Sequence, residues 1–89
     1  MAKFLIEMPH TYEACMEALD QMAEQGQQLL NQTWWGCPAG DHRGWAFVDA
    51  PSQSEALNMV PEPVREEVCV TEVQQFSADQ ISQMHRMAA

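Results

Sequence analysis

The sequence predicts an α+β fold whose strands and helices follow the order β-α-β-β-α-β, with one further helix at the C-terminus. Apolar side chains recur at every second position in some segments and at spacings of three and four in others, as in strands and helices respectively. Proline and glycine fall between those segments, as turn-forming residues do. The 89 residues suffice for one domain, residues 1–89, with a thin core.

The N-terminal part of the chain is predicted to form a strand followed by a helix. Residues 3–8 alternate apolar side chains with others until Pro9 ends the strand. Thr11 is then a suitable N-cap for the helix, and Gly26 is the residue that follows its C-terminus. The apolar positions of this helix recur at spacings of three and four: Tyr12, Cys15, Leu19 and Met22.

The middle of the chain is predicted to form two strands joined by a hairpin loop. Residues 33–37 and 44–49 are rich in β-forming side chains, and the Pro-Ala-Gly-Asp segment at residues 38–41 supplies the turn between them. Pro51 and Ser52 then begin a second, short helix.

The C-terminal part is predicted to form the last strand, over residues 68–76, and a terminal helix. Ser77 and Gln80 form a capping box for this helix, and Ile81 and Met84 share one of its faces. With right-handed crossovers, the first and third strands become central and the two crossover helices cover one face of the sheet. This arrangement is a ferredoxin-like sandwich.

The first three strands carry apolar residues on both of their faces. Trp34 lies beside Trp35, and Trp45 and Phe47 alternate with residues that are also apolar. A sheet with one face in water should instead alternate apolar with polar side chains. We therefore expect a second copy of the chain to cover the open face, as an isologous homodimer.

The segment at residues 34–42, Trp-Trp-Gly-Cys-Pro-Ala-Gly-Asp-His, resembles a Trp-Gly-Cys…Gly-Asp-His hairpin in short stand-alone members of the dimeric α+β barrel superfamily. The order of elements resembles that superfamily over nearly the whole chain. The resemblance implies the ferredoxin-like fold and a homodimer. The superfamily includes cofactor-less monooxygenases, lactone isomerases, haem-dependent enzymes and small nickel-binding proteins, so the resemblance implies an architecture and no single reaction.

The charge and composition of the chain limit the classes of partner that it is expected to bind. Thirteen acidic side chains against four basic ones give a net charge of −9, and the basic residues form no patch, so neither nucleic acid nor an anionic membrane is expected as a partner. No nucleotide cofactor is expected. No segment approaches the ~20 apolar residues that span a bilayer, and the N-terminal apolar run is too short for a signal peptide, so we expect a cytoplasmic protein. An odd number of cysteines, three, favours free thiols or metal ligands over a disulfide framework.

Cysteine and histidine residues that are distant in sequence are expected to meet at one rim of the sheet. The first and second strands run parallel in this fold, so His10 and Cys37 lie at the same edge. Cys15 lies in the opening turns of the helix that follows, and His42 returns along the hairpin to the same edge. Sulfur and imidazole ligands suit tetrahedral zinc or a comparable transition metal such as nickel or copper. The sequence therefore predicts a metal site formed by His10, Cys15, Cys37 and His42.

Three further residues are considered beside the four predicted ligands: Asp41, Cys69 and His85. Asp41 is available as an oxygen ligand or as the acceptor for an imidazole N–H. Cys69 begins the last strand at the same end of the sheet, so all three thiols are expected to project toward the rim, although a core or surface role suits Cys69 better than ligation. His85 is expected to interact with the dipole at the end of the last helix.

The four proposed ligands also suit structural roles, so two other functions stay open. Cys15 lies on an apolar helical stripe, Cys37 beside a turn, and the two histidines where imidazoles often hold loops. One alternative is a small-molecule enzyme in which Cys37, His42 and Asp41 act as nucleophile or base, helped by an unusually acidic thiol. The other is a non-catalytic interaction module. We favour a protein without enzymatic activity.

Overall fold

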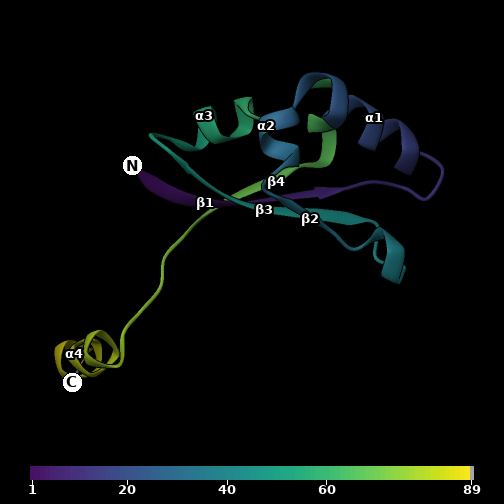
Figure 1. Ribbon diagram of the computed structural model, residues 1–89. Coiled ribbons are helices and arrows are strands. Elements are labelled where there is room, and N and C mark those ends of the chain that lie inside the picture. The colour runs from purple at the N-terminus through teal and green to yellow at the C-terminus, as the bar shows by residue number, and fades with distance from the viewer. Residues whose placement is uncertain (89) are drawn as a thin grey trace.

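The computed structural model describes residues 1–88 and contains one four-stranded antiparallel sheet with several helices (Figure 1). The strands are β1 (Ala2–Pro9), β2 (Thr33–Trp35), β3 (Arg43–Ala50) and β4 (Cys69–Val73). The α-helices are α1 (Cys15–Gln25), α2 (Gln27–Leu30), α3 (Gln53–Asn58) and α4 (Ala78–Ala88), and the 3-10 helices are η1 (Cys37–Ala39) and η2 (Glu62–Glu67). The predicted α+β class and the C-terminal helix are thus observed.

The strands lie in the order β2-β3-β1-β4, and each is antiparallel to its neighbours. The first and third strands are therefore central, as expected. β1 pairs with β3 over its whole length, from Ala2 opposite Ala50 to Pro9 opposite Arg43. Since β1 and β2 both run antiparallel to β3, they run parallel to each other and end at the same edge of the sheet, which we call the rim.

One face of the sheet packs against α1, α2 and α3 (Figure 1). Every second residue of the central strands points into this core and is at most 3% exposed: Phe4, Ile6 and Met8 from β1, and Ala46, Val48 and Ala50 from β3. The helices and the segments after them contribute Met22, Leu29, Ala56 and Val60. Within residues 1–88 the core holds no polar or charged side chain, so apolar burial is its main source of stability.

The other face of the sheet is not covered, and we keep the name open face for it. Trp34 is 80% exposed and Phe47 57% exposed, and Leu5 and Trp45 lie half-buried on the same side. Charged side chains border these apolar groups. Lys3 and Asp49 form an ion pair there at 3.5 Å. The apolar character of both faces, predicted from the sequence, is therefore observed.

The first helix begins later than the sequence predicts. The Thr11 hydroxyl oxygen accepts a hydrogen bond from the Ala14 N–H at 3.1 Å, but residues 12–14 form a turn and the helix proper starts at Cys15. The placement of Tyr12 on the buried stripe is therefore wrong, since its side chain is 77% exposed.

The caps of the two later helices confirm the predictions. Ser52 caps α3 by accepting a hydrogen bond from the Glu55 N–H at 3.2 Å. The capping box of α4 is reciprocal: the Ser77 N–H donates to Gln80 Oε1 at 2.7 Å, and the Gln80 N–H donates to Ser77 Oγ at 3.1 Å.

Two strands are shorter than predicted. The strand expected over residues 33–37 ends at Trp35, because Cys37–Ala39 form a 3-10 turn around Pro38, which has no N–H to donate to a ladder. The strand expected over residues 68–76 ends at Val73, and residues 74–77 leave the sheet without regular structure.

The C-terminal helix α4 stands away from the rest of the molecule, on the open side of the sheet (Figure 1). None of its described residues is buried. The radius of gyration is accordingly 15.9 Å, against about 12 Å for a compact domain of this length. No helix within residues 1–88 combines the length and the apolar character that a membrane crossing requires.

Candidate metal centre

Residues from four parts of the chain meet at the rim. His10 directly follows β1, Cys37 begins η1 after β2, and His42 directly precedes β3. The backbone N–H of His10 donates to the carbonyl oxygen of His42 at 3.0 Å. This bond ties the end of β1 to the start of β3 and brings the two imidazoles close together.

The loop between β2 and β3 is held by its own backbone. The Gly36 N–H donates to the Arg43 carbonyl oxygen at 2.9 Å, and the Asp41 N–H donates to the Gly36 carbonyl oxygen at 3.1 Å. A Cβ atom on Gly36 would lie 2.6 Å from the Asp41 carbonyl oxygen, so no larger residue fits there without backbone movement. Gly40 has a φ of 95°, a left-handed conformation that favours glycine. The loop therefore presents its cysteine and its histidine from a closely packed backbone.

Cys15 reaches the rim from the first turn of α1. The Thr11 cap and a hydrogen bond from the Cys15 N–H to the Tyr12 carbonyl oxygen, at 3.3 Å, form the turn before the helix. This turn brings the start of α1 close to the end of β1, and the Cys15 thiol is half-buried there.

The ligand-type atoms of the four residues predicted from the sequence all lie within 4.8 Å of one another: His10, Cys15, Cys37 and His42. The contact between His10 Nε2 and Cys37 Sγ is 3.2 Å. All four side chains are half-buried, so they are shielded from bulk water yet close to the surface. The structure thus brings together the residues that were expected to meet here.

Aromatic rings border the two imidazoles. The ring centroid of Trp35 lies 6.0 Å from that of His10, and Tyr12 meets His42 edge-on at 5.5 Å. The imidazoles themselves are 5.6 Å apart, with a tilt of 71°. Sequence reasoning missed the contact of Tyr12 with the cluster, because helical periodicity assigned this side chain to the core.

One ring nitrogen of the cluster is unsatisfied. The Nδ1 atom of His42 is buried and has no hydrogen-bond partner within residues 1–88. A buried polar atom in this condition costs about 1–3 kcal/mol relative to a satisfied one. Imidazole nitrogens accept hydrogen bonds or ligate metals, so a bound ion or water would stabilise this atom.

The Cys37 thiol is less acidic than expected. Burial raises the pKa of Cys37 above its ordinary value, and the neighbouring Cys15 thiol raises it further through a hydrogen bond and charge repulsion. The acidic, nucleophilic thiol of the enzyme alternative is therefore not supported, because burial and Cys15 disfavour the thiolate more than the backbone hydrogen bond favours it. A thiolate ligand forms by a different route, since a metal ion displaces the thiol proton.

Asp41 is engaged by an arginine and not by a histidine. Arg43 Nε donates to one carboxylate oxygen at 2.8 Å and Arg43 Nη2 to the other at 2.6 Å. This pairing lowers the pKa of Asp41. Asp41 lies outside the four-residue group, so its predicted roles as an oxygen ligand and as an acceptor for an imidazole are not supported.

The two remaining candidates lie away from the cluster. Cys69 begins β4 opposite Glu7, at the rim end of the sheet as expected, but it is exposed and lies outside the four-residue group. Two of the three thiols therefore meet at the rim. His85 lies in the last turn of α4, as predicted.

No protein-family model, curated protein or solved structure matches this chain. The function is therefore argued from the geometry of the rim alone, and the resemblance to the dimeric α+β barrel superfamily stays a hypothesis.

Proposed function

We propose that the protein binds one transition-metal ion, with zinc preferred, through His10, Cys15, Cys37 and His42. The observation that carries the proposal is the grouping of their nitrogen and sulfur atoms within 4.8 Å. Two imidazoles and two thiolates suit tetrahedral zinc, and nickel and copper compete for the same donors. The ion serves storage, sensing or structural stabilisation.

The distances fit a tetrahedral site after a small contraction. Zinc binds imidazole nitrogen at about 2.0–2.1 Å and thiolate sulfur at about 2.3 Å, so the ligand atoms of one ion are about 3.3–3.8 Å apart. The contact of 3.2 Å between His10 and Cys37 is already close to this spacing. The wider pairs, up to 4.8 Å, require inward movement of about 1 Å, which small χ rotations of the side chains provide.

Charge balance and redox state also favour this ligand set. Two thiolates neutralise a divalent cation, which lowers the cost of holding the ion in a half-buried site. The thiols must be reduced for this purpose, as they are in the cytoplasm, where we place the protein.

The enzyme alternative has less support. Asp41 is paired with Arg43 and is not available to orient His42 as a base. A thiol such as Cys37, with a raised pKa, is a poor nucleophile at neutral pH.

We also propose that the fold is the ferredoxin-like sandwich and that a second copy of the chain covers the open face. The strand order β2-β3-β1-β4, with helices between β1 and β2 and between β3 and β4, supports the first statement. The exposed Trp34 and Phe47 support the second, because contiguous apolar patches mark interaction surfaces. In an isologous dimer both copies contribute the same surface to the interface.

The proposal is tested by metal content and thiol protection on the full chain. Elemental analysis after addition of Zn²⁺, Ni²⁺ or Cu⁺, followed by dialysis, should find one ion per chain. Iodoacetamide labelling read by peptide mass spectrometry should then show that zinc protects Cys15 and Cys37. Cys69, which is exposed and outside the group, should react equally with and without zinc and is the internal control.

The matched variants are Cys37→Ser and Cys69→Ser. The first should lose bound zinc, and the second should retain it. Metal binding is contradicted if no ion binds in stoichiometric amount, or if zinc leaves the labelling of all three thiols unchanged.

A further inference from the structure

Helix α4 carries an apolar stripe that no other part of residues 1–88 covers. Ile81 is 46% exposed and Met84 51% exposed, and Phe76, just before the helix, is 49% exposed. Spacings of three and four residues place Ile81, Met84 and Ala88 on one side of the helix. An isolated helix of 11 residues is marginal in water, so the stripe requires a surface to pack against.

The open face of the sheet is a matching surface. It presents Trp34, Trp45 and Phe47, and α4 lies on this side of the sheet without reaching it (Figure 1). Strands about 4.8 Å apart make a four-stranded sheet about 15 Å wide between its outer strands. A helix of 11 residues is about 16 Å long, so α4 is long enough to cross the sheet.

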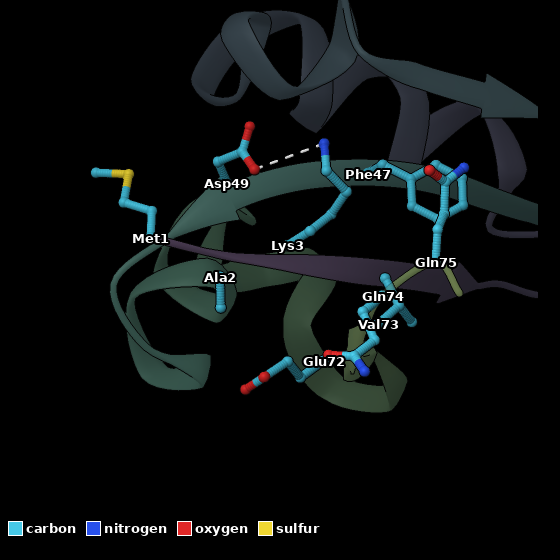
Figure 2. Close-up of a pocket in the computed structure, with 9 residues that line it drawn as sticks. All are labelled: Met1, Ala2, Lys3, Phe47, Asp49, Glu72, Val73, Gln74 and Gln75. Carbon is cyan, nitrogen blue, oxygen red and sulfur yellow. Dashed lines mark ion pairs between the residues drawn. The ribbon is translucent and has the colours of Figure 1, made fainter. Parts of the chain in front are cut away.

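The segment before α4 directs the helix away from its own sheet. Residues 74–77 read Gln-Gln-Phe-Ser and contain no glycine, proline, asparagine or aspartate, the residues that most favour a tight reversal. Their serine is already used as the helix cap. Where this segment departs, a hollow of about 760 Å³ opens between the start of β1, the end of β3 and residues 72–75 (Figure 2).

The charges of these two surfaces suit contact between identical chains. The residues of the open face and α4 together carry three basic and three acidic side chains: Lys3, Glu7, Arg43, Asp49, Asp79 and Arg86. Glu72 of β4 lies opposite Phe4 and so belongs to the other face of the sheet. The whole net charge of −9 therefore lies on other parts of the molecule. Two strongly acidic chains meet with least repulsion where each is locally neutral.

We propose that two copies of this chain exchange α4, so that the stripe formed by Ile81 and Met84 packs against the open face of the partner. The proposal rests on the homodimer proposed above and adds the element that completes its interface. Exchange of an identical element between two copies is a low-cost route to a dimer. The occupant of the open face is then a defined helix of a second copy.

Two substitutions in the full chain test the contribution of the stripe. The double variant Ile81→Asp/Met84→Asp should raise the dimer dissociation constant by about 100-fold or more, because charges replace apolar contacts in both halves of the dimer. The matched control is Gln83→Asp, which adds a charge on the opposite side of α4 and should leave the dissociation constant within about twofold. Sedimentation equilibrium measures both, and an equal effect of the two variants overturns the proposal.

Cross-linking in the full chain identifies which copy α4 contacts. A benzophenone amino acid replaces Phe47, and chains with ¹⁴N and ¹⁵N are refolded together and irradiated. Mixed-isotope pairs joining position 47 to residues 78–88 are the expected result. Only same-isotope pairs would mean that α4 folds onto its own sheet, which overturns the exchange. Interchain cross-links that omit α4 also overturn it but leave the homodimer standing, whereas a monomeric mass overturns both.

Discussion

The two ends of the sheet differ in how many of their side chains find contacts within a single chain. At the rim, short connections and backbone hydrogen bonds such as that from His10 to His42 bring four ligand-type side chains within 4.8 Å. At the opposite end, the chain leaves β4 through residues 74–77 and α4 stands away from the sheet (Figure 1), while Phe47 stays exposed. One end therefore brings its side chains together within a single chain, whereas the other leaves apolar side chains exposed.

The difference between the two ends allows metal binding and association between chains to be independent, although the two are often coupled in small homodimers. If the rim is complete within one chain, metal affinity should not depend on association. If the open face and α4 are completed by a second copy, association should not depend on the metal. Variants at one end, measured for both zinc affinity and dimer dissociation, test this independence.

The largest expected effect is the loss of a ligand. Structural zinc sites with four ligands contribute about 10–16 kcal/mol, or roughly 3 kcal/mol for each ligand, so His10→Ala should weaken zinc binding by about 100-fold or more. Competition with a chromophoric chelator measures this affinity. His85→Ala, which removes a histidine from α4, is the matched control and should bind zinc normally. A dimer that dissociates in His10→Ala would contradict the independence of the two ends.

The second prediction concerns pH. Because burial and the neighbouring Cys15 raise the pKa of Cys37, its thiol holds a proton at neutral pH that zinc must displace. Protonation of the Cys37 thiol weakens binding by up to about tenfold per pH unit below its pKa, so affinity should fall by about tenfold from pH 7.5 to 6.5. Proton release, measured by calorimetry in buffers of different ionisation enthalpy, should accompany binding. An affinity independent of pH in this range would argue against thiolate ligands.

The third prediction tests the loop that carries Cys37. Gly36→Ala places a Cβ atom 2.6 Å from the Asp41 carbonyl oxygen, so the backbone must shift, and zinc affinity should fall by about tenfold. Gly40→Ala meets no atom within 4 Å and suffers only its φ of 95°, which should lower the free energy of unfolding by about 1–2 kcal/mol with little change in affinity. Urea denaturation and chelator competition distinguish the two. Equal losses of affinity would show that strain, and not the close contact, controls the site.

The meeting of the four side chains at the rim could be predicted from topology. Parallel strands end at one edge of a sheet, so the residues after β1 and β2 had to lie near each other whatever their rotamers. The partner of Asp41 could not be predicted in this way, because the choice between His42 and Arg43 depends on side-chain direction at the start of β3. The exposure of Tyr12 was missed for a related reason: periodicity does not say where the first helical turn begins.

The position of α4 shows another limit of sequence patterns. Its capping box and its stripe were predicted correctly, since both depend on neighbouring residues. Which surface such a stripe packs against depends on long-range packing, which the pattern of Ile81 and Met84 does not encode. An amphipathic pattern therefore predicts that a helix has an apolar partner, and not which chain supplies that partner.

The smallest expected effect concerns the charge balance of the open face. Lys3 pairs with Asp49 at 3.5 Å, and both side chains are exposed, so the pair itself adds little stability to a single chain. Lys3→Glu leaves the open face with two excess negative charges in each copy. The dimer dissociation constant should therefore rise by about five- to tenfold at low ionic strength and by less as salt screens the charges. The double variant Lys3→Glu/Asp49→Lys restores neutrality and should recover association, with zinc affinity unchanged throughout. If instead Lys3→Glu weakens zinc binding at the rim, the two ends communicate, and the open face is not an independent surface.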